Sequence, residues 1–153
     1  MKIAFTGAQS TGKTTLLKEL KRDNNLALQY DFRDEITRRM QKKGLSINEG
    51  GSDITQLLIM NSHIKNSLID NVIMDRCALD GLVYTDWMYD NKKVSQWVRE
   101  YAENVFNLLI DRYDHIFYLV PEFSLEDDGV RSTNLKFRDD IVDLFDHYIK
   151  EYK

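Results

Sequence analysis

The sequence predicts an α/β domain in which helices cover both faces of a parallel sheet, giving a three-layer sandwich. Short apolar runs of strand length alternate with longer segments whose apolar residues recur at helical spacing, and this alternation is typical of parallel sheets. A glycine-containing loop at residues 7–14 joins the first strand to the first helix. We expect four strands, with a fifth as the alternative. The chain has 153 residues and no linker or repeat, so residues 1–153 should form one domain.

Turn residues separate the elements in the first half of the chain. Gly44 should end one helix, because glycine is common just after a helix C-terminus. Either Ser52 or Asp53 should cap the next helix, because both side chains can accept hydrogen bonds from its first free amides. The expected elements are a strand at 2–6, a helix at 14–23 with Leu16, Leu17 and Leu20 inward, a strand at 26–32, a helix at 34–43, and a helix after residue 52 with Ile54, Leu57, Leu58, Ile64 and Leu68 at helical spacing.

The second half continues the alternation of strands and helices. A buried strand should end at Asp75, and Pro121 should close another strand. In parallel sheets ligands bind at the carboxyl ends of the strands, so polar residues that follow strands should meet at one edge. The expected elements are a strand at 72–75, a helix at 78–89, a helix at 94–111 with Trp97, Val98, Tyr101, Val105 and Leu108 inward, a strand at 115–120, and a helix from about 134 with Phe137, Ile141, Leu144, Phe145 and Tyr148 inward.

Composition excludes several classes of protein. The chain is 42% hydrophobic and 30% charged, values of an ordinary globular domain, and it has neither a transmembrane-length apolar run nor a signal-peptide pattern. A single cysteine, Cys77, leaves no internal disulfide, and a reducing cytoplasm is the expected location. The net charge of −4 argues against broad binding to nucleic acid, although a local basic groove stays open.

The loop between the first strand and helix fits the phosphate-binding pattern G-x-x-x-x-G-K-[ST] at every fixed position. Its glycines let successive backbone amides face a phosphate, and the helix behind it adds a positive N-terminal end. We expect Lys13 to reach the terminal phosphates and the Thr14 hydroxyl to bind Mg²⁺. The predicted nucleotide-binding residues are Gly7, Ala8, Gln9, Ser10, Thr11, Gly12, Lys13, Thr14 and Thr15.

Asp75 and Arg76 follow the buried strand that precedes residue 78. An acid at that position can hold Mg²⁺ together with Thr14, or accept a proton from an attacking hydroxyl. The planar donors of Arg76 suit a substrate phosphate or hydroxyl. The alternative is structural, with Arg76 paired to Asp80 one helical turn later.

Glu35 and Arg38 lie three residues apart on one face of the helix expected after the second strand. They could hold the acceptor near the transferred phosphate, or form an ordinary ion pair. A basic stripe continues along this helix and slightly favours a phosphorylated acceptor, although a solvated helix face is the preferred interpretation of its last two members. The stripe comprises Arg38, Arg39, Lys42 and Lys43.

A polar segment at about 122–134, containing Asp127-Asp128-Gly129, has the character of a lid over an active site. Arg131 could move onto the transferring phosphoryl group and stabilise its charge, and Arg138 could assist from the helix behind it. The alternative for this segment is a surface loop with an internal Asp–Arg pair.

Several reactive or aromatic residues are interpreted as structural. No spacing typical of metal ligands links the histidines. Cys77 has no evident base nearby and is expected to pack as a small apolar residue. The aromatic residues could stack on a base, but core packing is favoured. These residues are His63, His115, His147, Tyr84, Trp87 and Tyr89.

Taken together, these motifs resemble the small P-loop kinases, in order along nearly the whole chain. The resemblance is strongest to the group that contains the ribosylnicotinamide kinase domain and phage-encoded relatives, and weaker to deoxynucleoside and thymidylate kinases. It rests on the phosphate-binding loop, Glu35-x-x-Arg38, Asp75-Arg76 with Asp80, and Asp128-Gly129-x-Arg131. Such kinases usually have another strand after the lid helix, whereas this sequence stops at Lys153, directly after that helix.

The resemblance implies ATP and Mg²⁺ as cofactors and phosphoryl transfer to a small nucleoside or nucleotide. By that analogy the catalytic residues are Lys13, Asp75 and Arg131, the metal is held by Thr14 and Asp75, and the acceptor is bound by Glu35, Arg38, Arg76, Asp80 and Arg138. The alternatives are a kinase acting on a nucleic-acid end or modified DNA base, and a P-loop NTPase or switch acting on a protein partner. No membrane partner is expected. The sequence does not decide between nucleoside and monophosphate acceptors, between ATP and GTP, or between oligomeric states.

Overall fold

A four-stranded parallel sheet forms the centre of the computed structural model, which describes residues 1–122 and 134–152. The strands lie in the order β2-β3-β1-β4, so β1 occupies an inner position beside β3. Ile3 pairs with Ile73 of β3 and Ala4 with Ile116 of β4, and every pairing is parallel. The predicted four-stranded sheet is confirmed. Its strands are β1 (Lys2–Thr6), β2 (Asp31–Arg33), β3 (Val72–Asp75) and β4 (His115–Tyr118).

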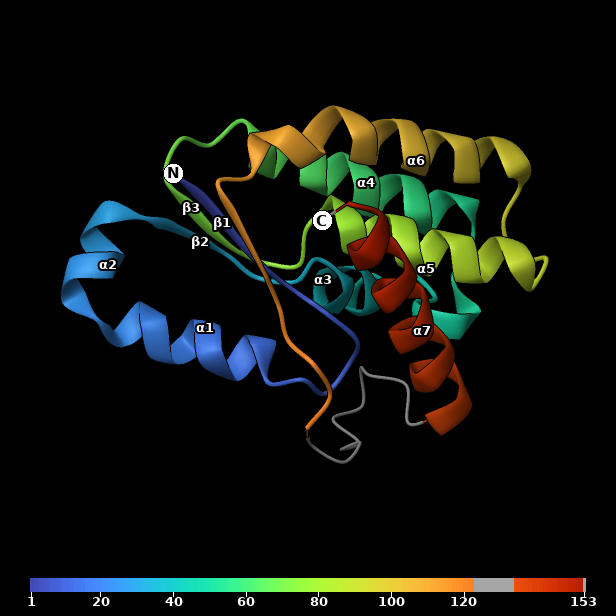
Figure 1. Cartoon of the computed structure of the whole chain (residues 1–153), viewed down its shortest axis with the longest axis horizontal. Coiled ribbons are helices and arrows are strands. Elements are labelled where there is room, and N and C mark those ends of the chain that lie inside the picture. The colour runs from blue at the N-terminus through green and yellow to red at the C-terminus, as the bar shows by residue number, and fades with distance from the viewer. Residues whose placement is uncertain (123–133, 153) are drawn as a thin grey trace.

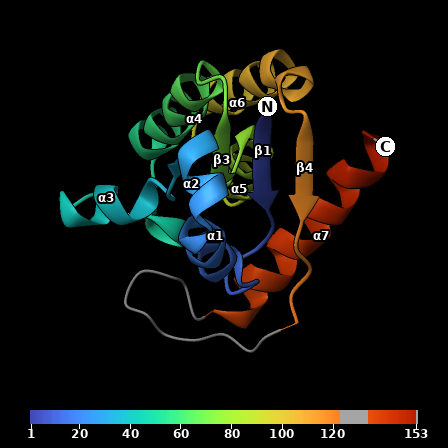
Figure 2. The ribbon, with the colours of Figure 1, turned by 90° about the vertical axis from the view of Figure 1, so that its left-hand side faces the viewer.

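Helices cover the sheet on both faces, as Figures 1 and 2 show. One face packs on α1, which α2 follows, and the other packs on α4, α5, α6 and α7, while α3 lies at the periphery. The helices are α1 (Lys13–Arg22), α2 (Asn24–Gln29), α3 (Thr37–Lys42), α4 (Asp53–Ser67), α5 (Ala78–Asp90), α6 (Gln96–Leu109) and α7 (Leu135–Glu151), with short 3-10 turns at Asn48–Gly50 and Ile110–Arg112.

Alternation along the strands divides the core into two unequal parts. Ala4 and Met74 point to the larger cluster under α4 to α7, whereas Phe5 and Ile73 point to a smaller one with Leu17 of α1. The larger cluster includes the fully buried rings of Phe106, Phe137 and Phe145. Because both faces are covered, the central strands are apolar throughout, which is why 72–74 reads as a continuous apolar run.

The expected strand at 26–32 is wrong over most of its length. The Asp23 carboxylate accepts hydrogen bonds from the amides of Asn25 (2.8 Å) and Leu26 (3.2 Å), and so caps α2 over Asn24–Gln29. No residue of α2 is buried, so its apolar side chains do not pack in the core beside the sheet. Only Asp31–Arg33 joins the sheet, paired with β3.

Helices α3 and α6 begin later than predicted, α6 at Gln96 rather than 94. Helix α3 begins at Thr37 rather than 34, and ends as expected before Gly44, whose φ of +78° is a conformation that favours glycine. Ser52 caps α4 in a capping box with Thr55. Helix α7 buries Phe137, Ile141, Phe145 and Tyr148 as predicted, while Leu144 is half-buried.

The inward face of α6 agrees with the prediction in part, because Val98 and Val105 are buried as expected while Trp97 and Leu108 are exposed. Trp97 and Leu108 are 56% and 65% exposed, whereas the buried residues are Val98, Ala102, Val105, Phe106 and Leu109. The start of the helix is fixed by Asp53 of α4, whose carboxylate accepts hydrogen bonds from the amide and the hydroxyl of Ser95, both at 2.8 Å. This contact fixes where the start of α6 lies against α4.

The carboxyl ends of the strands meet at one edge, as predicted. Phe5 pairs with Asp75 at the ends of β1 and β3, and the Leu119 amide after β4 donates to the Thr6 carbonyl (3.0 Å). The loop at 7–14, the residues after β2 and the Asp75-Arg76 pair therefore lie beside one another. This edge is the natural position for a ligand.

Candidate functional site

The loop between β1 and α1 has the backbone that its glycines allow. Gly7 has φ +135° and Gly12 has φ +83°, conformations that L side chains rarely adopt, and Ser10 also has a positive φ of +58°. A Cβ atom at Gly7 would lie 2.5 Å from the Leu119 carbonyl oxygen. Glycine is therefore required at position 7 both by conformation and by the close approach of the chain after β4.

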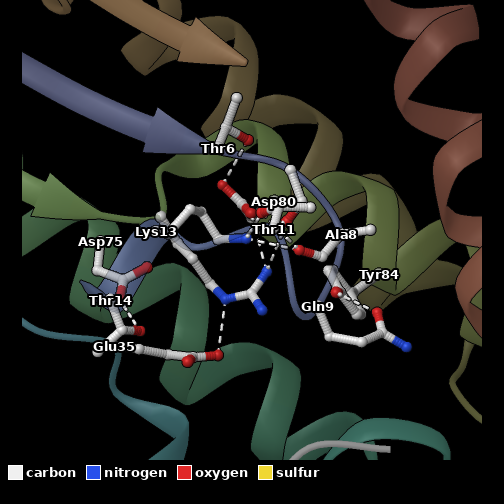
Figure 3. Close-up of polar contacts among 12 residues, drawn as sticks. Thr6, Ala8, Gln9, Thr11, Lys13, Thr14, Glu35, Asp75, Asp80 and Tyr84 are labelled. Atoms are coloured by element: carbon white, nitrogen blue, oxygen red, sulfur yellow. Dashed lines mark hydrogen bonds and ion pairs between the residues drawn. The ribbon is translucent and has the colours of Figure 1, made fainter. Parts of the chain in front are cut away.

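The ammonium of Lys13 lies inside this loop, as Figure 3 shows. Its Nζ donates to the carbonyls of Gly7 (2.8 Å) and Ala8 (2.6 Å) and to the Thr11 hydroxyl (2.9 Å). The side chain is buried, and burial, together with the charge of Arg76, lowers the pKa of Lys13 to about 8. A buried cation held only by neutral oxygens is suited to an incoming anion.

Thr14 and Asp75 are brought together by the first turn of α1 and the end of β3. The Thr14 hydroxyl donates to Asp75 Oδ2 at 2.6 Å, and Asp75 Oδ1 is buried without a hydrogen-bond partner among the described residues. Burial and the negative charge of Glu35 raise the pKa of Asp75. A hydroxyl and a carboxylate with an unpaired oxygen form a donor set that Mg²⁺ prefers.

Arg76 links the loop to the segment after β2 and to the first turn of α5. Its Nε donates to Glu35 (2.6 Å), and its Nη1 donates to Asp80 (2.9 Å) and more weakly to the Gly7 carbonyl (3.3 Å). Its φ of +79° is uncommon for a residue with a side chain. The structural pairing of Arg76 with Asp80 is thus present, and it is part of a wider network at the sheet edge.

The two carboxylates that hold Arg76 are positioned differently. Asp80 accepts from the Thr6 hydroxyl (2.7 Å) and the Cys77 amide (2.9 Å) as well as from Arg76, so its lone pairs are well used. Burial would raise the pKa of Glu35, but the Arg76 guanidinium, with help from the Thr37 hydroxyl, holds it below its ordinary value. Glu35 is therefore an ionised acceptor at neutral pH.

A cavity of about 600 Å³, partly open to solvent, adjoins this network. The residues after β2, the Asp75-Arg76 pair, one face of α4 and one face of α5 line it. Among the predicted site residues, Glu35, Asp75, Arg76 and Asp80 lie on its wall.

The remaining predicted residues are placed elsewhere. Arg38 is half-buried in α3 and Arg138 is buried in α7, and neither is among the described residues that line the cavity. The rest of the basic stripe is exposed on α3 and the turn after it. Arg131 and most of the expected lid fall within 123–133, outside the described residues.

Two residues that line the cavity, Tyr84 and His63, were assigned to the core or to a structural role by the sequence, and a third, Gln56, was not singled out. The Tyr84 hydroxyl donates to Gln9 Oε1 of the loop (3.2 Å), and its ring lies 5.0 Å from the Arg76 guanidinium carbon. His63 and Gln56 of α4 also line the cavity. Gln56, His63 and Asn66 lie at helical spacing, which predicts a polar face on α4. Because the prediction for this helix rests on its apolar residues alone, it misses that face.

Cys77 lies where the sequence predicts, in the core. Cys77 is fully buried in the larger core, and burial raises the pKa of its thiol, as expected for a packing residue. Within 1–122 and 134–152, His, Cys, Asp and Glu side chains form no group of three or more suited to a metal ion. A cation at Thr14 and Asp75 would therefore depend on oxygens of a ligand or of water. None of the described helices combines the length and the apolar character needed to span a bilayer.

Comparison with known proteins agrees with this architecture. A sequence model for the AAA domain family matches residues 2–153. No curated protein sequence matches significantly.

Solved structures of low sequence identity share the fold. A NadR protein in complex with NR superposes with a TM-score of 0.74 at 21% identity; 98% of this chain is covered, but only 42% of that one. A deoxyadenosine kinase from M. mycoides gives 0.68 at 18% identity, covering 99% of this chain and 84% of the other. A shikimate kinase from Aquifex aeolicus gives 0.57 at 22% identity, covering 99% and 82%. The fold is that of the small P-loop kinases, as the sequence predicted.

Proposed function

The chain belongs to the AAA domain family, and from this membership and the site we propose that it transfers a phosphoryl group from ATP to a small nucleoside or nucleotide. The observation that carries the proposal is the 2.6 Å hydrogen bond between Thr14 and Asp75. It lies beside the loop that surrounds the Lys13 ammonium, and Asp75 also lines the cavity. Donor, metal and acceptor sites then share one edge of the sheet.

The donor phosphates would lie in the loop at 7–14. The unpaired polar atoms Ser10 Oγ and Gln9 Nε2 are buried there without partners among the described residues, and they can serve phosphate oxygens. Lys13 would exchange its carbonyl partners for the terminal phosphates, a charge-assisted and therefore stronger interaction. The neighbouring Thr15 completes the predicted set at the start of α1.

Thr14 and Asp75 would hold Mg²⁺ through the hydroxyl and the unpaired Oδ1. When bound, the ion neutralises charge on the phosphate oxygens during transfer. The raised pKa of Asp75 describes the protein without that cation, and a nearby divalent charge stabilises the ionised carboxylate.

The acceptor would lie in the cavity with its hydroxyl facing Asp75 and Glu35. In the transfer, the acceptor oxygen forms a bond to the γ-phosphorus, the bond from phosphorus to the ADP oxygen breaks, and the hydroxyl proton leaves to a carboxylate. Arg76, which is itself held by Asp80, orients the Glu35 carboxylate, and the ionised Glu35 can accept a hydrogen bond from the acceptor. Arg38, Arg131 and Arg138 stay as proposed substrate or lid residues.

The other two candidate functions have less support. A nucleic-acid acceptor would use the basic stripe, but none of its four residues is among the described residues that line the cavity. No feature of the described site specifically supports a switch that acts on a protein partner. A cytoplasmic location, suggested by the lone buried thiol of Cys77, belongs to the same proposal.

A panel of nucleosides and mononucleotides incubated with ATP and Mg²⁺ tests the proposal. We expect ADP release that depends on one acceptor class, with the phosphorylated product identified by mass spectrometry. Lys13→Ala should abolish turnover, whereas Lys18→Ala, a change at an exposed lysine of the same helix, should not. Acceptor-independent hydrolysis would instead support the NTPase reading, and stimulation only by DNA would support the nucleic-acid kinase.

A further inference from the structure

The wall of the cavity formed by α4 contains an unsatisfied imidazole. His63 is 4% exposed and lines the cavity, and neither Nδ1 nor Nε2 has a hydrogen-bond partner among the described residues. Buried side-chain nitrogens in folded proteins nearly always have a partner, because leaving one unpaired costs its full desolvation. A buried imidazole that faces a cavity without a partner therefore indicates a missing ligand group.

Packing against α5 fixes where this ring lies. A Cβ atom at Gly81 would meet His63 Cδ2 at 3.3 Å and Met60 Sδ at 2.2 Å, so the two helices approach closely only because residue 81 is glycine. The imidazole is thus held between the helices, at the wall of the cavity that it lines. Asn66, the next residue along the same face of α4, is half-buried and also lines the cavity.

The charges on the cavity wall favour an uncharged ligand. Its described lining includes the carboxylates of Asp34, Glu35, Asp75 and Asp80, but Arg76 is the one arginine or lysine among them. That guanidinium already bonds Glu35 and Asp80. A phosphate on the acceptor would face more negative than positive charge in this space.

The protonation state of His63 agrees with that conclusion. Burial lowers its pKa to about 4; among its charged neighbours Asp80 opposes the shift and Arg76 adds to it. At neutral pH the ring is therefore an uncharged group with one N–H donor and one acceptor nitrogen. It is suited to hydrogen-bond a neutral polar edge, and is unsuited to pair with a phosphate.

We propose that His63 is the specificity-determining residue of the acceptor pocket, and that it hydrogen-bonds a neutral polar group on an unphosphorylated nucleoside. This inference rests on the proposed kinase function and names the substrate class for the same site. The amide of Asn66 provides a second polar group beside it. Gln56, by contrast, is already engaged, because its amide accepts from the Thr85 hydroxyl (3.1 Å) and donates to Met88 Sδ (3.0 Å).

The experiment compares the native protein with His63→Leu, His63→Gln and the control His147→Leu, whose histidine is exposed on α7. Adenosine, guanosine, cytidine, uridine and thymidine, each with its 5′-monophosphate, are offered with ATP and Mg²⁺. We expect a nucleoside to be preferred over its monophosphate. His63→Leu should raise the KM for that nucleoside by about tenfold or more, with kcat and the KM for ATP nearly unchanged. His63→Gln should restore part of the affinity, and His147→Leu should match the native protein.

Two further measurements separate recognition from a structural role. The melting temperature of the free His63→Leu variant should equal or exceed that of the native protein, because an unpaired polar group is removed from a buried position. Imidazole signals in ¹⁵N-labelled protein should shift for His63 when the nucleoside is added without ATP. A lowered melting temperature with an unchanged KM would overturn the proposal, as would a preference for monophosphates.

The same set of measurements separates this inference from the proposed function. If nucleosides shift the His63 signals but none is phosphorylated, the kinase proposal fails and the role of His63 in binding stands. If a nucleoside is phosphorylated equally well by His63→Leu, the kinase proposal stands and the role of His63 fails. Binding of no member of the panel would overturn the role of His63.

Discussion

The Thr14 hydroxyl and the Asp75 carboxylate lie 2.6 Å apart although 61 positions separate them in the chain. The parallel pairing of β1 with β3 places the end of one strand beside the end of the other, and the loop after β1 returns the start of α1 to the same edge. Both residues thus face the point where phosphate, cation and acceptor would meet, and the most direct test is to change the carboxylate.

Replacing Asp75 by asparagine should separate stability from catalysis. Asn keeps an oxygen that accepts from the Thr14 hydroxyl but loses the charge for the cation, so we expect kcat to fall by roughly 10²–10³-fold with a much smaller change in KM. Because burial raises the pKa of Asp75, its ionised form opposes folding, and the variant should melt at an equal or higher temperature. Steady-state kinetics and thermal melts measure both effects. The control is Asp139→Asn, a change at an exposed residue of α7. An unchanged kcat would contradict the role of Asp75.

Nucleotide affinity should decrease as pH rises above about 8. The pKa of Lys13 is lowered to about 8 in the free protein, and phosphates stabilise the protonated form, so binding raises that pKa. Above pH 8 the free protein has lost a proton that the complex retains, and the Kd for ATP should rise by up to about tenfold per pH unit. Calorimetry from pH 7 to 9.5 measures how the Kd for ATP depends on pH. The control variant Lys18→Met should show the same dependence as the native protein. A slope of the same size in Lys13→Met would show that another group titrates.

Acid should destabilise the protein through His63. A histidine whose folded pKa is about 4 and whose unfolded pKa is about 6.5 binds protons mainly in the unfolded state, so stability falls as pH decreases from 6.5 to 4. The full effect is about 3 kcal/mol, with Asp80 and Arg76 as the charged groups that modulate it. Denaturant unfolding at pH 7.5 and 4.5 should show a smaller loss for His63→Leu than for the native protein. Equal losses would mean that the ring is already protonated or exposed.

Gly81→Ala should destabilise the fold although it lies inside a helix. Alanine usually gains about 1 kcal/mol over glycine in a helix interior, but here its Cβ would lie 2.2 Å from Met60 Sδ, whose side chain is fully buried. Overpacking of this kind costs typically about 1–3 kcal/mol. Chemical denaturation in the native and Met60→Ala backgrounds forms a double-mutant cycle, in which the penalty should shrink once the methionine is shortened. A stabilised Gly81→Ala single variant would contradict the close approach of α4 and α5.

The sequence predicted structure correctly where contacts between residues close in the chain determine the backbone. The loop at 7–14 was identified from its glycines, lysine and threonine, and the C-terminal helix from its apolar spacing, because both depend on contacts within a few residues. The same reasoning failed at 26–32, where a strand-like run forms α2, since a single side-chain cap at Asp23 outweighs a weak β preference on the surface. It also placed Trp97 and Leu108 of α6 inward although both are exposed, because the start of that helix is anchored through Ser95 to Asp53, a residue 42 positions away.

By itself the sequence determined the parallel α/β fold, the phosphate-binding loop and the polar residues that follow the strands. Those features follow from periodicity and from turn chemistry, which are local. Only the tertiary structure decided that Asp75 meets Thr14, that Arg76 is shared between Glu35 and Asp80, and that the imidazole of His63 faces the cavity. These are contacts between elements that are distant in the chain. Their energies depend on burial and on neighbouring residues that are brought together only when the chain folds.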